Sequence, residues 1–435
     1  MPEFFKYASA KLIRNKLIRN YDFLNYYSSL QERNRFISNF TREYQFSQLK
    51  KILQYANNNV PYYNKLFKEV KFDPDKMKSF KEINRIPLLT RDDIIENFEQ
   101  LISTKKIKGG SYVAKTSGTS GSPLEIMHDY KSFFVENAFI YHYRKKLGYE
   151  FSDRLVTFRG VEFKKKISKL NPIHNELILS PFKLSAITLD YYLKTIDSFE
   201  PDYIHGYLSA IYFFAKFLSE RNLKLKKKLK GIFLISENIK QDKRDFIESY
   251  FDTKSLTLYG HTERCIIAEE VEANVYQFDP YYGYTEFQKN NDGTMAIIGT
   301  GFINQTMPLI RYKTDDSCIK VANGYKIMGK WESDAGIFGK NMELFTHATI
   351  PTASSCYNNV IQSQYIQDEI GKAKILIIPT NKFTDHDAKA IVNEIIKRTN
   401  GAIELKVEIV DKLILSPRGK LSLFHNTVKN NVLVS

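Results

Sequence analysis

The chain has 435 residues, of which 43% are hydrophobic and 14% aromatic, and it carries a formal net charge of +15 at pH 7. This composition excludes a disordered chain, and the length predicts two domains, because one hydrophobic core rarely supports so many residues. The cysteines, Cys265, Cys318 and Cys356, are odd in number and widely spaced, which argues against a disulfide framework and for a reducing compartment.

The basic charge raises the question of nucleic-acid binding, since phosphate backbones attract lysine and arginine. No nucleic-acid-binding signature occurs, and the basic residues are spread along the chain apart from the run Lys224 to Lys230. We therefore expect no nucleic-acid partner. Solvated surface lysines, or an enzyme that handles ATP, an acidic substrate or an anionic membrane surface, account equally well for the charge.

The first 100 or so residues are predicted to be mainly helical, because apolar residues recur at helical spacing from Phe4 to Ile13 and from Leu49 to Ala56. The first stretch is also basic, so it fits either a helix on an anionic membrane surface or one docked on the protein's own core. No uncharged run is long enough to span a bilayer, and no signal-peptide core is present. We expect a cytoplasmic protein, with peripheral contact to the inner membrane face as an open alternative.

A run of small and turn-forming residues, Lys115–Pro123, follows an apolar stretch. Gly118 and Gly121 let the backbone approach an anion closely, and successive N–H groups can form an anion-binding nest. The Gly-Lys-Ser/Thr ending of a Walker loop is missing. The run is therefore either a solvated surface linker or a polyphosphate-binding loop. In the second case the candidate ligands are Thr116, Ser117, Gly118, Thr119, Ser120 and Gly121.

From about residue 110 to residue 330, short β-rich runs alternate with longer amphipathic stretches, which predicts an α/β fold of sheets covered by helices. Strands are predicted at Leu155–Phe158, Gly231–Ile235 and Ala296–Ile298, and helices at Leu208–Leu218 and Lys243–Tyr250. Gly299-Thr300-Gly301 lacks the third glycine and the following helix of a dinucleotide-binding fingerprint, so we expect no nicotinamide cofactor.

The pattern restarts after Gly329-Lys330-Trp331. Lys374–Pro379 and Leu405–Val410 are predicted strands, and Asp387–Thr399 is a predicted amphipathic helix. Mixed α+β content over about a hundred residues fits a small domain of its own. We place the boundary near residues 332 to 336, which predicts a large domain over residues 1–331 and a small one over residues 332–435.

Three further segments accompany the glycine-containing loop in chain order: Leu258–Glu263, Met307–Asp316 and Ser416–Lys420. In this order and at these separations the set resembles the adenylate-forming superfamily of acyl-CoA ligases, peptide-synthetase adenylation domains and luciferases. The closer resemblance is to the phenylacetate–CoA ligase branch, especially its capsular-polysaccharide-associated members. Four stretches carry this closer likeness, which covers nearly the whole chain: Asn59–Tyr63, Ile86–Ile94, Thr157–Gly160 and Pro201–Tyr207.

The resemblance implies a large multi-layered α/β domain with a helical start, followed by a small mobile α+β lid. It also implies an ATP- and Mg²⁺-dependent, AMP-forming ligase that joins a carboxylate to AMP, releases pyrophosphate, and passes the acyl group to coenzyme A or a carrier-protein thiol. Two alternatives remain open. One is an amide-forming ligase that modifies a sugar or uronic acid in capsule synthesis, and the other is a non-catalytic scaffold at a membrane surface. The acid, the acceptor and the oligomeric state are not predicted.

The resemblance also assigns roles to residues. Lys420 would stabilise the charge that develops as the carboxylate meets the α-phosphate of ATP. Tyr259 would stack on adenine, Thr262 would bind the α-phosphate, and Glu263 would hold Mg²⁺. Asp316 would take both ribose hydroxyls.

The remaining expected site residues fall into two groups. Those of the nucleotide site are the loop residues Thr116 to Gly121, which would wrap the β- and γ-phosphates, and Ser236, Glu237, Gly260, His261 and Lys330. Those of the acyl pocket are His205, Gly206 and Tyr207, with Arg159 as a partner for an acidic substrate or product.

Two positions depart from the family pattern. Asp315 stands where a glycine usually precedes the ribose ligand, and the hinge, Gly329–Asp334, has Lys330 in place of arginine and its aspartate one place late. Lysine makes less geometrically fixed hydrogen bonds than arginine, so the ribose contact and the lid swing are expected to differ. Without the resemblance, Arg418-Gly419-Lys420 would be an exposed turn, and Tyr259 and Glu263 would be a buried and an exposed residue at a strand end.

Overall fold

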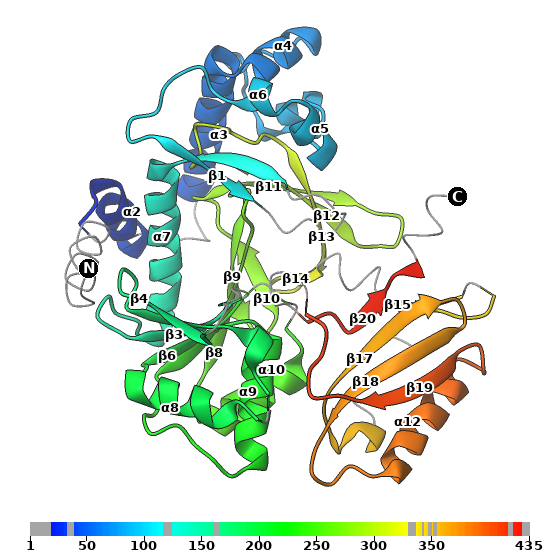
Figure 1. Ribbon diagram of the computed structural model, residues 1–435. Coiled ribbons are helices and arrows are strands. Elements are labelled where there is room, and N and C mark those ends of the chain that lie inside the picture. The colour runs from blue at the N-terminus through cyan, green and yellow to red at the C-terminus, as the bar shows by residue number, and fades with distance from the viewer. Residues whose placement is uncertain are drawn as a thin grey trace. The chain divides into compact units, whose positions relative to one another are not determined.

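The computed structural model describes residues 19–32, 39–115, 124–159, 163, 166–185, 187–235, 237, 239–328, 336–341, 343–346, 350, 355–415 and 421–428. The chain divides into two compact units. Unit 1 is drawn from Met1–Ser152, Pro172–His174 and Leu256–Met328, and unit 2 from Asp153–Asn171, Asn175–Ser255 and Gly329–Ser435. Figure 1 labels most of the helices and strands of both.

Unit 1 contains the helical start that the sequence predicts. Its helices are α2 (Tyr21–Glu32), α3 (Asn39–Asn59), α4 (Pro61–Glu69), α5 (Arg91–Glu96), α6 (Phe98–Leu101) and α7 (Tyr130–Arg144), with 3-10 turns η1 (Phe80–Arg85) and η2 (Lys145–Leu147). Leu49, Leu53 and Ala56 are fully buried on one face of α3, as their spacing indicates. The basic stretch from Phe4 to Ile13 lies outside the described residues.

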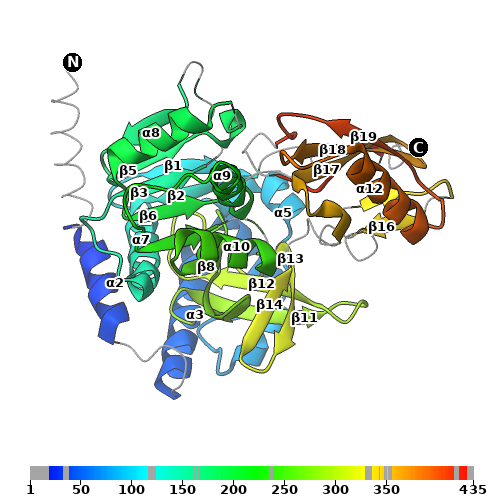
Figure 2. The ribbon, with the colours of Figure 1, turned by 90° about the horizontal axis from the view of Figure 1, so that it is seen from below.

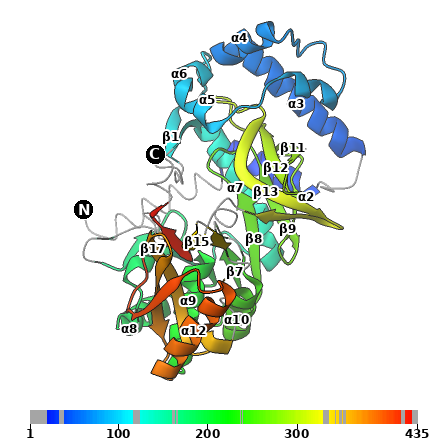
Figure 3. The same cartoon turned by 90° about the vertical axis from the view of Figure 1, so that its right-hand side faces the viewer.

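The sheet of unit 1 has the order β11-β12-β13-β14-β10-β9-β8. Its strands are β8 (Ser255–Gly260), β9 (Ile267–Glu272), β10 (Val275–Phe278), β11 (Gly283–Lys289), β12 (Met295–Gly301), β13 (Tyr312–Val321) and β14 (Gly324–Met328). Side chains from α3 and α4 share one apolar core with β12 and β13, which fixes these helices against the sheet. Figure 3 shows α3 beside these strands.

A separate antiparallel pair in unit 1 consists of β1 (Ser111–Lys115) and β2 (Glu125–Asp129). Lys115 pairs with Glu125 at the end of this ladder, and their side chains form an ion pair of 2.6 Å. Residues 116–123, which include the predicted phosphate-binding loop Thr116 to Gly121, lie between the two strands and outside the described residues. The predicted loop would therefore connect two antiparallel strands that are paired up to Lys115 and Glu125.

The first part of unit 2 is a mainly parallel sheet with the order β7-β6-β3-β5-β4. It consists of β3 (Leu155–Phe158), β4 (Ser168–Asn171), β5 (Glu176–Leu179), β6 (Tyr203–Gly206) and β7 (Gly231–Leu234), with η3 (Pro181–Lys183), α8 (Leu189–Phe199), α9 (Leu208–Glu220) and α10 (Gln241–Phe251). Every residue of β3, β5 and β7 is buried, as expected of strands covered on both faces. The three helices share one apolar core with the strands, and Figure 1 shows them together.

The second part of unit 2 is a C-terminal module with its own core. It contains β15 (Gly336–Phe338), β16 (Leu344–Thr346), η4 (Ser355–Tyr357), β17 (Val360–Glu369), β18 (Lys372–Pro379), α12 (Asp385–Arg398), β19 (Glu404–Ile409) and β20 (Phe424–Asn426). The sheet order is β19-β18-β17-β20, and α12 lies against it through Ile391 and Ile395 (Figure 2). The strands and the helix predicted here are confirmed.

The expected domain boundary, between residues 331 and 332, lies outside the described residues, so it stays a prediction. Ile361 of β17 and Ile378 of β18 belong to the apolar core of the parallel sheet, so within unit 2 the C-terminal module packs on that sheet. No helix in the described part of the chain is long and apolar enough to cross a bilayer.

Candidate active site

Tyr259 and Asp316, the residues expected at adenine and ribose, lie side by side in unit 1. The hydroxyl of Tyr259 donates to Oδ2 of Asp316 at 2.9 Å. Burial and the Asp316 carboxylate raise the pKa of Tyr259 well above its ordinary value, so the phenol keeps its proton and remains the donor. The bond connects the end of β8 to β13 and holds the carboxylate in one orientation.

Glu263, the expected Mg²⁺ ligand, lies just beyond β8 among polar neighbours. Its carboxylate is 3.2 Å from Nδ1 of His261, and it accepts a hydrogen bond of 3.2 Å from the hydroxyl of Tyr312. Burial raises the pKa of Glu263, but His261 and Tyr312 outweigh burial, so the pKa lies below its ordinary value and the group is ionised at neutral pH. Tyr312 is a contact that we did not anticipate from the sequence.

A single ionised carboxylate fits Mg²⁺, which proteins commonly hold with one or two carboxylates while substrate phosphates and water complete the octahedron. The described residues contain no cluster of three or more acidic, histidine or cysteine side chains that could hold a metal unaided. Nε2 of His261 is buried without a hydrogen-bond partner among the described residues, while Nδ1 faces the Glu263 carboxylate. The imidazole therefore retains hydrogen-bonding capacity at Nε2.

His128, a residue that we did not select from the sequence, fixes the backbone at Thr262. Its Nε2 donates to the carbonyl oxygen of Thr262 at 2.8 Å, and the ring is fully buried. Burial and the nearby Arg264 guanidinium lower the pKa of His128 to about 3, so the ring is neutral at physiological pH. Arg264 itself forms an ion pair of 2.5 Å with Glu136 of α7. The turn that carries Thr262 and Glu263 is thus held from both α7 and β2.

The geometry of β13 accounts for the unusual Asp315. Between Lys313, which pairs with Ile298, and Ser317, which pairs with Ala296, β13 has more residues than β12, so the strand bulges. Asp315 is exposed, whereas Asp316 is partly buried toward Tyr259. A bulge redirects side chains at a site, and here it leaves the extra carboxylate exposed next to the expected ribose ligand.

Two of the stretches that carry the family resemblance, Asn59–Tyr63 and Ile86–Ile94, contact the segment that leads into β13. The hydroxyl of Tyr63 accepts a hydrogen bond from the Ile310 amide at 3.0 Å, and Leu89 forms a parallel bridge with Tyr312. Arg311, in the left-handed region with φ 53°, donates from Nε and Nη2 to Glu286 at 2.9 to 3.2 Å. These contacts hold the segment that leads into β13 and thereby position Asp316.

The candidate residues of unit 2 follow three neighbouring parallel strands. Arg159 comes after β3, His205–Tyr207 ends β6, and Glu237 comes after β7. The carboxyl ends of adjacent parallel strands meet at one edge of a sheet, where α/β proteins bind ligands. The parallel pairing of β3 with β6 and of β6 with β7 therefore brings these residues to the same edge.

Contacts at this edge are specific. Nδ1 of His205 lies 3.3 Å from the hydroxyl of Thr157, while Glu237 accepts 2.8 Å bonds from both the amide and the hydroxyl of Ser209. Glu237 thus binds the first turn of α9, where the helix dipole favours a negative charge. Arg159 is exposed.

The close packing of β6 against β3 requires a glycine at position 206. The φ of Gly206 is 151°, and a Cβ atom there would lie 2.5 Å from the carbonyl oxygen of Phe158 and 2.9 Å from its Cβ. Only glycine fits this close pairing of β6 with β3. Gly260 differs, because a Cβ would meet no heavy atom closer than 3.7 Å. The glycine of the Tyr259–Glu263 motif is therefore not required by packing.

Several expected site residues lie outside the described residues: Thr116, Ser117, Gly118, Thr119, Ser120, Gly121, Ser236, Lys330 and Lys420. Their roles stay predictions.

Comparison with known proteins gives one family model, CapK C-terminal domain, which matches residues 338–430. These residues are the C-terminal module. Protein CapK from Staphylococcus aureus is 24% identical over 408 residues, which cover 89% of each chain.

Solved structures resemble most of the chain. A 2-hydroxyisobutyryl-CoA ligase in the postadenylation state, in complex with R3-HIB-AMP, has a TM-score of 0.66 at 14% identity and covers 90% of this chain and 92% of its own. The same ligase with 2-HIB-AMP and CoA in the thioesterification state has a TM-score of 0.56 at 14% identity and covers 92% and 94%. The chain has the fold of an adenylate-forming ligase. The expected mixed α/β architecture with a C-terminal domain is therefore confirmed.

Proposed function

We propose that the protein is an ATP-dependent, AMP-forming ligase, which activates a carboxylic acid as an acyl-adenylate and transfers the acyl group to the thiol of coenzyme A or a carrier protein. The observation that carries the proposal is the Tyr259–Asp316 pair beside the ionised Glu263 at the end of β8. This pair occurs on a fold shared with a ligase whose structure contains an acyl-AMP. The resemblance to the phenylacetate–CoA ligase branch supports the same activity.

In this proposal, unit 1 binds the nucleoside. Adenine stacks on the ring of Tyr259, and the two ribose hydroxyls donate to the carboxylate of Asp316. The Tyr259 hydroxyl donates to Oδ2 of Asp316 and so helps to orient the carboxylate that would bind the sugar. Glu263, kept ionised, would hold Mg²⁺, which when bound supplies positive charge to the phosphates.

Activation needs little covalent chemistry from side chains. A carboxylate oxygen of the acid forms a bond to the α-phosphorus of ATP while the bond to the bridging oxygen breaks, and pyrophosphate leaves. We assign charge stabilisation at this step to Lys420 and Thr262, and binding of the β- and γ-phosphates to Thr116–Gly121. Arg159 and His205–Tyr207 are assigned to the acid.

A second candidate concerns the acceptor. The CapK C-terminal domain match covers the module that precedes and includes Lys420, the part of such ligases on which acceptor transfer depends. Together with the likeness to Protein CapK, this match supports an association with capsule synthesis, for which the second candidate is a ligase that forms an amide on a sugar or uronic acid. Such an enzyme would share the adenylation step and work at the cytoplasmic face of the membrane.

The test is acid-dependent pyrophosphate release from ATP across a panel of aryl, fatty, amino and uronic acids. At least one acid should support release, and acyl transfer should then be compared with coenzyme A and with amino sugars as acceptors. A thioester product supports the leading proposal, and an amide product supports the second candidate. If no acid in the panel supports release by the folded protein, the ligase proposal is wrong and the scaffold hypothesis gains.

Lys420→Ala separates the two steps. The variant should lose roughly a hundred- to thousandfold in pyrophosphate release, the usual effect of removing one charge-stabilising group. It should still transfer the acyl group from a supplied acyl-adenylate, because that step does not involve the pyrophosphate leaving group. Adenylation at the wild-type rate would show that Arg418-Gly419-Lys420 is a surface turn.

A further inference from the structure

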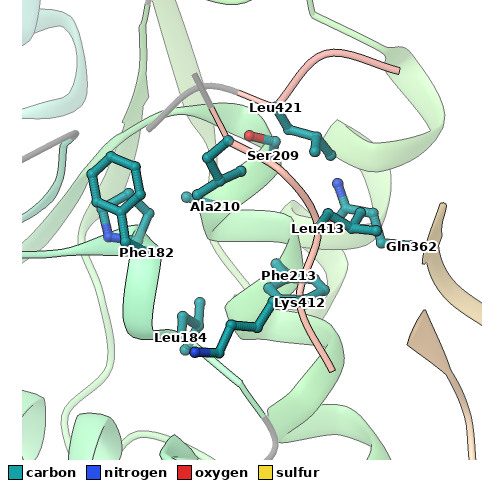
Figure 4. A pocket seen from close by; sticks show the side chains of 11 residues that line it. Phe182, Leu184, Ser209, Ala210, Phe213, Gln362, Lys412, Leu413 and Leu421 are labelled. Atoms are coloured by element: carbon teal, nitrogen blue, oxygen red, sulfur yellow. The ribbon is translucent and has the colours of Figure 1, made fainter. Parts of the chain in front are cut away.

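Unit 2 contains a pocket whose walls come from segments far apart in the sequence. The first turns of α9 contribute Ala210 and Phe213, the η3 turn contributes Phe182, and the C-terminal module contributes Gln362 of β17 with Leu413 and Leu421 (Figure 4). The space measures about 440 Å³ including its open mouth. Apart from Ser209, Gln362 and Lys412, its lining is apolar, as in sites that bind the non-polar part of a small molecule.

Gln362 is the unusual member of this lining. The residue is only 6% exposed, and its amide nitrogen is buried without a hydrogen-bond partner among the described residues. Ser209 differs, because its hydroxyl is already bonded to Glu237. Buried donors in native proteins are almost always satisfied, so an unpartnered donor on an apolar wall indicates a bound group that supplies an acceptor.

The pocket also adjoins the segment that carries Lys420. Leu415 and Leu421, both in the lining, form an antiparallel bridge at the base of residues 416–420. Gln364 closes this base, since its Nε2 donates to the carbonyl oxygens of Ile414 and Ser422 at 2.9 Å each.

We propose that this pocket receives the apolar group of the carboxylic acid, and that an oxygen on that group accepts a hydrogen bond from Gln362. The proposal rests on the proposed function and names the class of its substrate: an acid with a short apolar chain bearing a hydroxyl or carbonyl. The acid is favoured over the acceptor because the lining residues Ser209 and Ala210 lie on the first turn of α9, directly after His205–Tyr207, which we assign to the acid.

The experiment measures kcat/KM for pyrophosphate release with straight-chain acids from acetate to octanoate and with hydroxylated octanoates. For wild type, kcat/KM should rise with chain length until the pocket is full. Ala210→Phe, which fills the pocket, should remove this rise. Its kcat/KM should be lower than that of wild type by roughly tenfold for each methylene that no longer fits. Ala322→Phe, the same change at an exposed turn between β13 and β14, is the matched control and should retain the rise.

Gln362→Leu tests the hydrogen bond. The variant should lose the preference for hydroxylated over plain octanoate, while its thermal midpoint stays equal or rises, because an apolar group of similar size replaces an unpartnered donor. Gln288→Leu, at an exposed position of β11, is its control. An unchanged preference in Gln362→Leu would overturn the role of the amide.

A thermal-shift titration with octanoate reports occupancy without turnover. A shift in wild type that Ala210→Phe abolishes, with no pyrophosphate release for any acid, would uphold the pocket and refute the ligase proposal. Equal thermal shifts and equal chain-length profiles in both proteins would show that the pocket does not bind the apolar group of the acid, and would leave the ligase proposal intact. If the variants change only transfer from a supplied acyl-adenylate, the occupant is the acceptor and our assignment is wrong. Should Ala210→Phe not fold, Leu413→Ala enlarges the pocket and should extend the preference to longer acids.

Discussion

The buried His128 makes a prediction about stability whose size can be worked out from the structure. Its Nε2 hydrogen donates to the Thr262 carbonyl, so a second proton would have to sit on Nδ1, which is buried without a partner among the described residues and near the Arg264 cation. The folded pKa is about 3, against an ordinary value of 6.5. Below pH 6.5 the unfolded chain takes up this proton and the folded chain does not. The free energy of unfolding therefore falls as the pH drops from 6.5 toward 3.

Each pH unit in that window removes about 1.4 kcal/mol, and the change from pH 7 to pH 5 amounts to about 2 kcal/mol. His128→Gln keeps an amide that can donate to Thr262 but has no proton to gain. Urea unfolding at pH 7 and pH 5 gives, for each protein, the change in the free energy of unfolding between the two pH values. The contributions of the other titrating groups are the same in both proteins and cancel when the two changes are compared. Wild type should lose about 2 kcal/mol more than the variant. If both proteins lose the same free energy, His128 is not held neutral and our account of the Thr262 turn is wrong.

Three further predictions concern single residues. Gly206→Ala should lower the free energy of unfolding by about 1–3 kcal/mol from backbone strain alone, whereas Gly260→Ala, with room for its Cβ, should unfold like wild type. Equal urea midpoints for the two variants would contradict the close pairing of β6 and β3. Asp316→Asn should raise the Michaelis constant for ATP by roughly tenfold or more with little change in thermal midpoint, since the amide oxygen can still accept from Tyr259. Unchanged ATP kinetics would remove the residue from the ribose site. Arg311→Lys should cost about 2 kcal/mol of stability, because lysine cannot reproduce the guanidinium's multiple bonds to its partly buried carboxylate partner. A urea midpoint like that of wild type would show that the bonds contribute nothing.

Local patterns predicted the secondary structure well where apolar residues repeat regularly. The predicted strand Leu155–Phe158 is β3, the helix Leu208–Leu218 is α9 apart from its last two residues, and the C-terminal strand Lys374–Pro379 lies within β18. These segments are each buried along a strand or one helix face, and such burial leaves a period of two or 3.6 in the sequence. The fold class followed from the alternation of these elements, and the solved structures agree.

The site was predicted less completely. The resemblance selected Tyr259, Glu263 and Asp316, and the structure brings Tyr259 and Asp316 into contact. It did not select His128 or Tyr312, because each acts on the site through one atom. Nothing in the sequence around His128 distinguishes it from an ordinary strand residue, whereas Tyr312 lies in the same motif as Asp316 and could have been indicated by that position.

The sequence by itself determined which segments form strands and helices, where the polar turns between them fall, and that carboxylates and glycines follow particular strands. The tertiary structure alone decided which of these residues meet. Tyr259 and Asp316 are 57 residues apart, and His128 and Thr262 are 134 apart. Their contacts depend on strand order, register and the bulge in β13, which short-range periodicity does not encode. The pocket that includes Ala210 and Gln362 has the same origin, since it exists only where α9 and the C-terminal module pack together.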